Sequence, residues 1–441
     1  MLIMENNKLT ADEKLIAELM PRKFNKLGVI WVALLSVICV FGLYAYILQL
    51  RYGLVVTGLR DYASWGIYIS NFEFFVSISI VAALFTAILR LFNVNWATPI
   101  TRIAEIIAFS GILFGAIIII VDMGRPERFY NLFIFGRLQS PILWDVIVIC
   151  TYLCVSVILL YIPLMPDLKL LIERKPKAVA FLHGIYKFFG SFWTGSKEQE
   201  KVANNSVNIL CVAMVPVALI VKSVTSWLFA TTFRTGWDSN NFGAYFISGA
   251  FLVGAGCVVV AMYIYRKYWG LEKYITDMHF DKMGRILVLL ALIYGYFNIN
   301  EYMLPFFKVK KEEEILLNSL FSGSYAVAFW SAIIGGMIIP TVIMLFKNGR
   351  KPVPMFICGL LIVTGAWIKR YLIVTPTMLL PFLPMHNVPP AYTHYYPTWQ
   401  EWAIDIATLA GALLVVTLFT RFFPILPIQE LINESHEKDN K

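Results

Sequence analysis

The sequence has 441 residues, of which 59% are hydrophobic and 15% are charged. A soluble domain carries about 45–50% apolar and about 25% charged residues, so the apolar excess here must face lipid. The mean hydropathy of +0.70 excludes a disordered chain, a collagen-like fibre and a small disulfide scaffold. The formal net charge of +9 comes from cations that lie between apolar runs, so we expect no nucleic-acid partner.

Apolar runs long enough to cross about 30 Å of hydrocarbon recur along the whole chain. They predict an all-α polytopic membrane protein with about ten transmembrane helices. The first 26 residues are polar and the run after them is too long for a signal-peptide core, so we expect no cleaved signal. The predicted helices cover residues 27–50, 64–89, 103–122, 142–164, 207–230, 242–265, 286–306, 324–346, 353–375 and 399–420.

Lys and Arg are distributed unevenly between alternate loops. The loops on the side of the N-terminus hold 25 of them, whereas the opposite loops hold 9. Because Lys and Arg are enriched on the cytoplasmic side, this predicts an inner-membrane protein with both termini in the cytoplasm and the other loops in the periplasm. Residues 1–26, the loop 165–206 and the tail 421–441 are then cytoplasmic.

A short internal repeat recurs at an offset of 178 residues. Thr57-Gly58 and Ile69-Ser70 in the first copy match Thr235-Gly236 and Ile247-Ser248 in the second. Both copies precede a predicted helix on the same side of the membrane, which indicates a parallel duplication. We therefore expect two duplicated four-helix bundles, 64–230 and 242–375, with the helices 27–50 and 399–420 as flanking helices.

Few residues in this chain suit a metal or haem. Its six cysteines lie within apolar segments without a paired motif, which argues against Fe–S or zinc ligation by this chain. Its five histidines lie between or beyond the apolar runs, whereas a haem-carrying helix bundle needs histidines within them. We expect no haem, no Fe–S cluster and no metal in this chain.

Ionisable residues inside the predicted helices are numerous, although each costs about 2.5–3.5 kcal/mol at mid-helix. All but Glu105 fall in the periplasmic half of the membrane. Salt bridges between helices are one explanation, and a polar site that opens outward for a polar head group or an ion is the other. The residues in that half are Glu73, Asp122, Asp145, Lys222, Glu301, Lys369, Arg370, Glu401 and Asp405.

Two periplasmic loops carry unusual sequences. In 122–145, Gly124 and Pro126 end a helix, and Arg125 can turn back to a carboxylate at the same level such as Asp122. A rigid turn that ends the helix at the membrane interface is the other interpretation. The loop 376–398 is rich in proline and has no Lys or Arg, which is typical of a stiff surface that could dock a partner.

Several blocks together resemble the NrfD/PsrC family of integral membrane subunits of quinone-linked oxidoreductases. They are SWGIYISNFEFF, DMGRPERFYNLF, GRLQSPILWD, SVTSWLFATTFRTGW and WIKRYLIVTPTMLLPFLP, in this order from about residue 50 to 410. The ten-span form is similar to the DsrP and QrcD subunits and to those of alternative complex III. In this chain Lys222 stands where many members have histidine, and Ile80 lies near a second such position.

The resemblance implies a quinone-binding subunit that works only within a larger complex. It implies that menaquinone or ubiquinone binds near the periplasmic face as substrate, and that electrons pass to or from a docked, ferredoxin-like Fe–S subunit. A molybdopterin or multihaem cytochrome subunit lies beyond that partner. By the family's pattern, the matching positions are Asp122, Arg125, Asp145, Glu301 and Arg370.

Quinol oxidation releases two protons and two electrons, so a site needs hydrogen-bond acceptors near the hydroxyl groups. Our hypothesis is that Glu73, Asp122 and Glu301 accept the protons. Lys222 or Arg370 would steady an anionic quinone. The remaining members of the predicted quinone site are Arg125, Asp145, Trp227 and Tyr302.

Two other functions remain open for this sequence. One is proton translocation, alone or beside quinone chemistry, because intramembrane carboxylates suit it. The other is an ion or small-solute transporter without a redox partner. Co-purification with an Fe–S subunit would separate the redox complex from the transporter.

Overall fold

The computed structural model describes residues 11–21, 24–60, 63–92, 94–232, 234–308, 310–380, 387–389 and 392–432. All regular elements within these ranges are helical, and ten of them are long and apolar enough to cross a membrane. The predicted all-α fold is confirmed. The ten are α2 (Lys26–Tyr52), α3 (Ile67–Leu91), α4 (Thr98–Asp122), α6 (Pro141–Arg174), α8 (Lys197–Ala230), α9 (Phe242–Trp269), α10 (Asp277–Lys308), the span Ala326–Leu345, α14 (Pro352–Met378) and α15 (Trp399–Phe422).

The span Ala326–Leu345 is composite, because a π-helical stretch separates two short α-helices. Its parts are α12 (Ala326–Trp330), η6 (Ser331–Ile338) and α13 (Ile339–Leu345). Shorter elements connect the spans. They are α1 (Ala11–Leu19), η2 (Leu54–Val56), η3 (Asn95–Ala97), η4 (Pro126–Arg128), α5 (Asn131–Ile134), η5 (Lys177–Leu182), α7 (His183–Gly190), α11 (Lys311–Phe321) and η7 (Lys347–Arg350).

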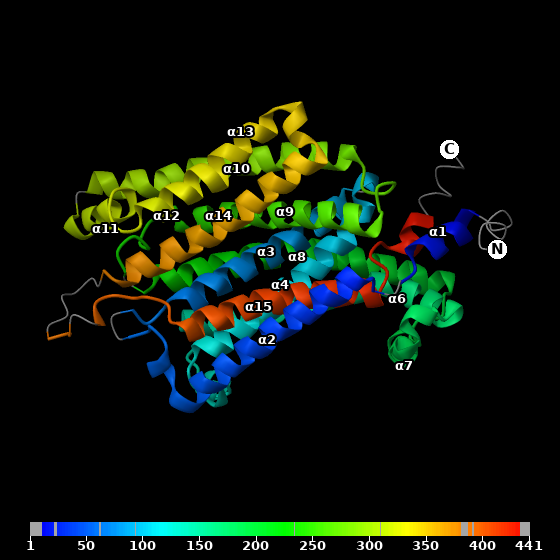
Figure 1. Ribbon diagram of the computed structural model, residues 1–441, viewed down its shortest axis with the longest axis horizontal. Helices are drawn as coiled ribbons and strands as arrows, with labels where there is room; N and C mark the ends of the chain where they lie inside the picture. Colours follow the sequence, from blue (N-terminus) through cyan, green and yellow to red (C-terminus); the bar gives the residue numbers. More distant parts are fainter. Residues whose placement is uncertain are drawn as a thin grey trace.

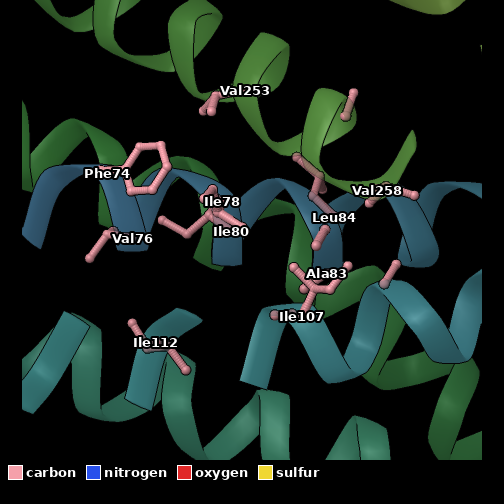
Figure 2. Packing of buried hydrophobic residues seen from close by; sticks show 14 of the residues in the cluster. Phe74, Val76, Ile78, Ile80, Ala83, Leu84, Ile107, Ile112, Val253 and Val258 are labelled. Atoms are coloured by element: carbon pink, nitrogen blue, oxygen red, sulfur yellow. The ribbon is translucent and has the colours of Figure 1, made fainter. Parts of the chain in front are cut away.

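Helix α3 is the centre of the structure. It packs against α4, α8, α9 and α14, and 89% of its most apolar window is buried, against 11% for α2. Figure 2 shows its apolar side chains, among them Phe74 and Ile80, facing Ile107 of α4 and Val253 of α9. Because this helix is surrounded by others, the polar residues in its first half, such as Glu73 and Ser77, lie away from both lipid and water.

The helices around α3 fall into two sets. On one side α3, α4, α6 and α8 contact one another, and on the other α9, α10, α13 and α14 do so. Helices α2 and α15 pack on each other, and α15 also packs on α4 (Figure 1). The division into two four-helix bundles with two flanking helices stays a proposal, because α3 packs against α9 and α14 of the other set as well.

The two ends of the bundle differ. Helices α1 and α7 lie at one end together with the last described residues of the chain, whereas α11 lies at the opposite end (Figure 1). We call these the terminal end and the α11 end. The predicted cytoplasmic N-terminal segment lies partly outside the described residues, as do the last residues of the tail and, in the loop 376–398, Pro381, Pro384 and Pro390.

Glycines allow the central helices to approach closely. A Cβ atom at Gly111 of α4 would lie 3.0 Å from the Cβ atom of Ser79 on α3, and one at Gly254 of α9 would clash with that of Val81. The backbones of η6 and α14 also approach closely, because a Cβ atom at Gly336 would lie 2.6 Å from the Cα atom of Gly365.

We expect Gly336→Ala to destabilise the protein, because the added methyl group must push η6 away from α14. The cost of such overpacking is about 1–3 kcal/mol, and thermal unfolding of the purified protein in mild detergent measures it. Gly335→Ala is the matched control, because a Cβ atom at Gly335 has no neighbour within 4 Å. Equal melting temperatures for the two variants would contradict this account of the η6–α14 contact.

Candidate functional site

A buried ion pair joins α3 to α8 in the middle of the bundle. The Nζ atom of Lys222 donates to Oε2 of Glu73 over 2.8 Å, and both side chains are at most 2% exposed. Burying either charge alone in these apolar surroundings would cost several kcal/mol. The two residues are therefore buried as a pair, in which each charge offsets the other. The second carboxylate oxygen, Oε1 of Glu73, has no hydrogen-bond partner within the described residues.

Two more polar contacts adjoin this pair. Thr225, one helical turn after Lys222, donates to Oδ1 of Asp145 on α6 over 2.8 Å. From α14, Nη2 of Arg370 approaches Oγ of Ser77 at 3.3 Å, and Ser77 lies one turn after Glu73 on α3. These six side chains form what we call the core group: Glu73, Ser77, Asp145, Lys222, Thr225 and Arg370.

Arg370 is a member of the core group with an unused hydrogen-bond donor. Its side chain is buried, and its Nη1 atom lacks a hydrogen-bond partner among the described residues. The guanidinium lies 4.9 Å from the ring centre of Phe246 on α9, and Lys222 lies 5.8 Å from the same ring. The face of one aromatic ring thus stabilises two neighbouring cations. An anionic or carbonyl oxygen in this region would find an unused donor.

A second group lies between α10 and α14 and is separate from the core group. Glu301 accepts a hydrogen bond of 2.7 Å from Ser239, and Lys369 donates to the hydroxyl group of Tyr302. Lys369 also lies 4.6 Å from the ring centre of Phe329. Since Lys369 and Arg370 are adjacent on α14, this helix presents one cation to each group.

A third group lies between α3 and α15. Asp405 accepts a 3.2 Å hydrogen bond from Asn71, and its Oδ2 atom has no partner in the described part of the chain. Glu401 forms a capping box with Thr398 and accepts further hydrogen bonds from Gly58 and Tyr395. Glu401 therefore has a structural role at the start of α15.

The two loop residues expected to pair do not. Arg125 is exposed, and the ion pairs found among the described residues do not include it. Asp122 ends α4, where Oδ1 is buried and lacks a hydrogen-bond partner within the described ranges. The expectation that Arg125 turns back to Asp122 is wrong, because the turn at Gly124, with φ of +66°, and Pro126 carries the chain onward into η4.

The predicted site residues therefore do not share one open cavity. Glu73, Asp145, Lys222 and Arg370 come together, Glu301 and Tyr302 lie in the second group, and Asp122 is near neither. Trp227 is 52% exposed on the outside of the bundle. The cavities that touch Glu301 and Arg370 measure about 40 and 20 Å³, which is room for a few water molecules.

A set of paired charged residues at the terminal end was not predicted from the sequence. Arg102 pairs there with Asp167 in complete burial, and Arg90 pairs with Glu105 and Glu430. Arg90 and Arg102 counted as loop residues because the predicted helices were too short. Within the described residues, no group of three or more His, Cys, Asp or Glu side chains could hold a metal ion.

A family model described as "Polysulphide reductase, NrfD" matches residues 55–381. The chain belongs to the NrfD polysulphide reductase family. It is thus an integral, multi-pass membrane protein of a family that the sequence blocks around Asp122, Asp145 and Arg370 already indicated.

Three relatives match over nearly the whole chain. A selenate reductase subunit of Mesobacillus selenatarsenatis is 23% identical, over 93% of this chain and 97% of that protein. The menaquinone reductase integral membrane subunit of Nitratidesulfovibrio vulgaris is 25% identical, over 97% and 99%. The Hdr-like menaquinol oxidoreductase integral membrane subunit of Archaeoglobus fulgidus is 23% identical, over 91% and 95%.

We expect Lys222→Met to destabilise the protein by about 3–5 kcal/mol, because it leaves the carboxylate of Glu73 buried without its cation. The double variant Glu73→Gln/Lys222→Met should lose less free energy of unfolding than the sum of the losses in the two single variants. Unfolding of the four variants of this double-mutant cycle, measured in detergent, gives the coupling energy.

Lys273→Met is the control for this cycle, because Lys273 pairs with Glu18 at the surface and is 77% exposed. Such pairs contribute about 0–1 kcal/mol. A Lys222 variant no less stable than the Lys273 variant would show that the buried pair is not required.

Proposed function

We propose that this chain is the quinone-binding membrane subunit of a respiratory oxidoreductase complex. It binds quinone or quinol near the periplasmic face and exchanges electrons with a docked Fe–S subunit, and it is not catalytic alone. Two relatives whose names contain menaquinone reductase and menaquinol oxidoreductase support this proposal. The bias of Lys and Arg toward the loops of the terminal end supports an inner-membrane location with both termini in the cytoplasm.

The observation that carries the proposal is the core group. Within the apolar centre of the bundle, Glu73 has one carboxylate oxygen without a partner among the described residues, and Arg370 has one guanidinium nitrogen without such a partner. The group also contains a second carboxylate, that of Asp145. A purely structural network would satisfy these atoms, because an unpaired buried polar atom costs about 1–3 kcal/mol. A quinone head group offers what they lack, since its oxygens both donate and accept hydrogen bonds in the quinol form.

The proposed chemistry assigns proton transfer to carboxylates. A quinol hydroxyl beside Oε1 of Glu73 gives up its proton, and Lys222 offsets the charge changes on Glu73. Arg370 and Asp145 hold the two ends of the head group, which orients it. Asp122 and Glu301, at the α11 ends of α4 and α10, receive protons on their way to periplasmic water.

The remaining predicted residues take supporting roles in this proposal. Tyr302 accepts a hydrogen bond from Lys369, follows Glu301 in the sequence and lines the cavity of about 40 Å³. Trp227 and Arg125, which are exposed, would contact the quinone tail or the lipid at the entrance. The small cavities mean that a head group enters only when the helices around them separate.

The α11 end offers charged side chains to a partner subunit. Asp238 contacts Lys308 at 3.6 Å and Lys310 at 3.4 Å, and both lysines also contact Glu313. The negative charge of Asp238 raises the pKa of Lys310, so this lysine stays charged at neutral pH. We propose that a ferredoxin-like Fe–S subunit docks at this end, with a molybdopterin or multihaem cytochrome subunit beyond it.

We expect Glu73→Gln, Asp122→Asn and Glu301→Gln each to lower quinol turnover by about 100-fold or more, because a positioned proton acceptor contributes about 10²–10⁴-fold. Turnover is measured with a quinol analogue in the assembled complex. The control is Glu272→Gln, an exposed residue between α9 and α10 at the terminal end, which should leave the rate unchanged. Normal rates in both the Asp122 and the Glu301 variants would contradict the assignment.

A further inference from the structure

A cavity of about 490 Å³ lies at the terminal end, opposite the proposed quinone site. The end of α3, the start of α4, α6, α8 and the segment after α15 form its walls. Asn204, Asn208, Thr98 and Thr101 are among its polar lining residues. Since a water molecule occupies about 30 Å³ in the liquid, this space accommodates more than ten.

The inner wall of the cavity is charged. Arg90 lines it and bridges Glu105 at 3.2 Å and Glu430 at 3.0 Å. Glu105 is 2% exposed, and its Oε2 atom lacks a hydrogen-bond partner in the described part of the chain. A buried carboxylate with one free oxygen therefore lies behind Arg90, one side chain away from the cavity.

The charges of the lining argue against an anionic ligand such as a lipid phosphate. Arg90 is already shared by two carboxylates, and Asp167, Glu200 and Glu430 outnumber Arg90 and Lys169 in the lining. The polar walls suit water, and the Oε2 atom of the buried Glu105 carboxylate, unpaired among the described residues, suits a proton.

Buried hydroxyl groups lie on α3 on both sides of the level of Glu105, with Thr86 toward the cavity and Ser79 toward the core group. Thr86 of α3 bonds the carbonyl of Thr101 at 3.3 Å, and Ser79 lies 3.1 Å from the hydroxyl group of Tyr152. Ser79 also bonds the carbonyl of Ala108, so the register of α3 and α4 places Glu105 opposite Ala82.

Along α3, Ala82 lies nine residues from Glu73, which is about 14 Å at 1.5 Å per residue. Ser77 and Ser79 are fully buried within this interval. Hydroxyl groups can accept one proton while they donate another, so each is a possible relay step.

We propose that the cavity is a hydrated inlet through which protons pass between the terminal face and Glu105, and from there along Ser79 and Ser77 to the core group. A proton from cavity water binds the Glu105 carboxylate, and the same proton leaves toward α3, so Glu105 ends each transfer unchanged. The inlet itself follows from the cavity and its charges. Only its destination rests on the proposed function.

Thiol labelling tests whether water fills the inlet. Thr101→Cys, which lines the cavity, should react with a small charged thiol reagent added at the terminal face at least about tenfold faster than Thr86→Cys, which is buried outside it. The unsubstituted protein, with its six native cysteines, gives the background rate. Labelling of Thr101→Cys at the rate of Thr86→Cys would overturn the inlet, whether or not the protein handles quinones.

Proton movement tests the function of the inlet. In proteoliposomes with the whole complex, Glu105→Gln should lower proton movement at the terminal face at least about tenfold, while quinol turnover in uncoupled vesicles stays unchanged. Arg90 keeps Glu430 as its partner in this variant, which favours folding.

Unchanged proton movement in Glu105→Gln would overturn the proposal. A complex without any quinol turnover would instead contradict the proposed function, and the labelling result would still decide whether the inlet exists.

Discussion

The cost of burying charge where neither water nor lipid head groups reach it determines how this bundle is arranged. Glu73 lies on the one helix that is surrounded on all sides, so its negative charge persists only with a cation from a neighbouring helix. Lys222 supplies that cation from α8 at 2.8 Å. The position of α8 against α3, and the proximity of Asp145 and Arg370, follow from where this pair must form.

Around that pair the bundle has two polar ends of different character. At the α11 end, short contacts and cavities of a few tens of cubic ångströms leave little space for water. At the terminal end, a cavity of about 490 Å³ reaches inward to the ion pairs of Arg90 and Arg102. The buried serines of α3 lie between the two ends. This asymmetry suits a protein in which a lipid-soluble substrate and protons arrive from different sides.

Much of the fold could be predicted from the sequence, because the length of an apolar run is a direct consequence of membrane thickness. The limits of α6 and α8 could not, since both helices have 34 residues and extend well beyond the hydrocarbon region. For that reason Asp167 of α6 counted as a loop residue, as did Arg102 in the unpredicted first turn of α4, although the two pair in complete burial. The parts of a helix that extend beyond the hydrocarbon region contain both polar and apolar residues, so a hydropathy profile does not show where the helix ends.

The grouping of the site residues was predictable only in part. Spacing along a helix shows that Glu73 and Ser77 share a face, but which helix lies opposite depends on packing between distant segments. The sequence analysis counted Glu401 among the ionisable residues of the polar layer, although Thr398-x-x-Glu401 at the start of an apolar run is the capping-box pattern that the structure shows. The adjacent cations Lys369 and Arg370 could not be assigned to separate groups without the position of α14.

The most direct test of the central claim is a structure of the assembled complex with a bound quinol analogue. The account predicts a head group about 3 Å from the unused Oε1 of Glu73 or Nη1 of Arg370, on the α11 side of the bundle. A head group bound in the cavity of about 490 Å³ at the terminal end, with the Glu73–Lys222 pair untouched, would contradict it.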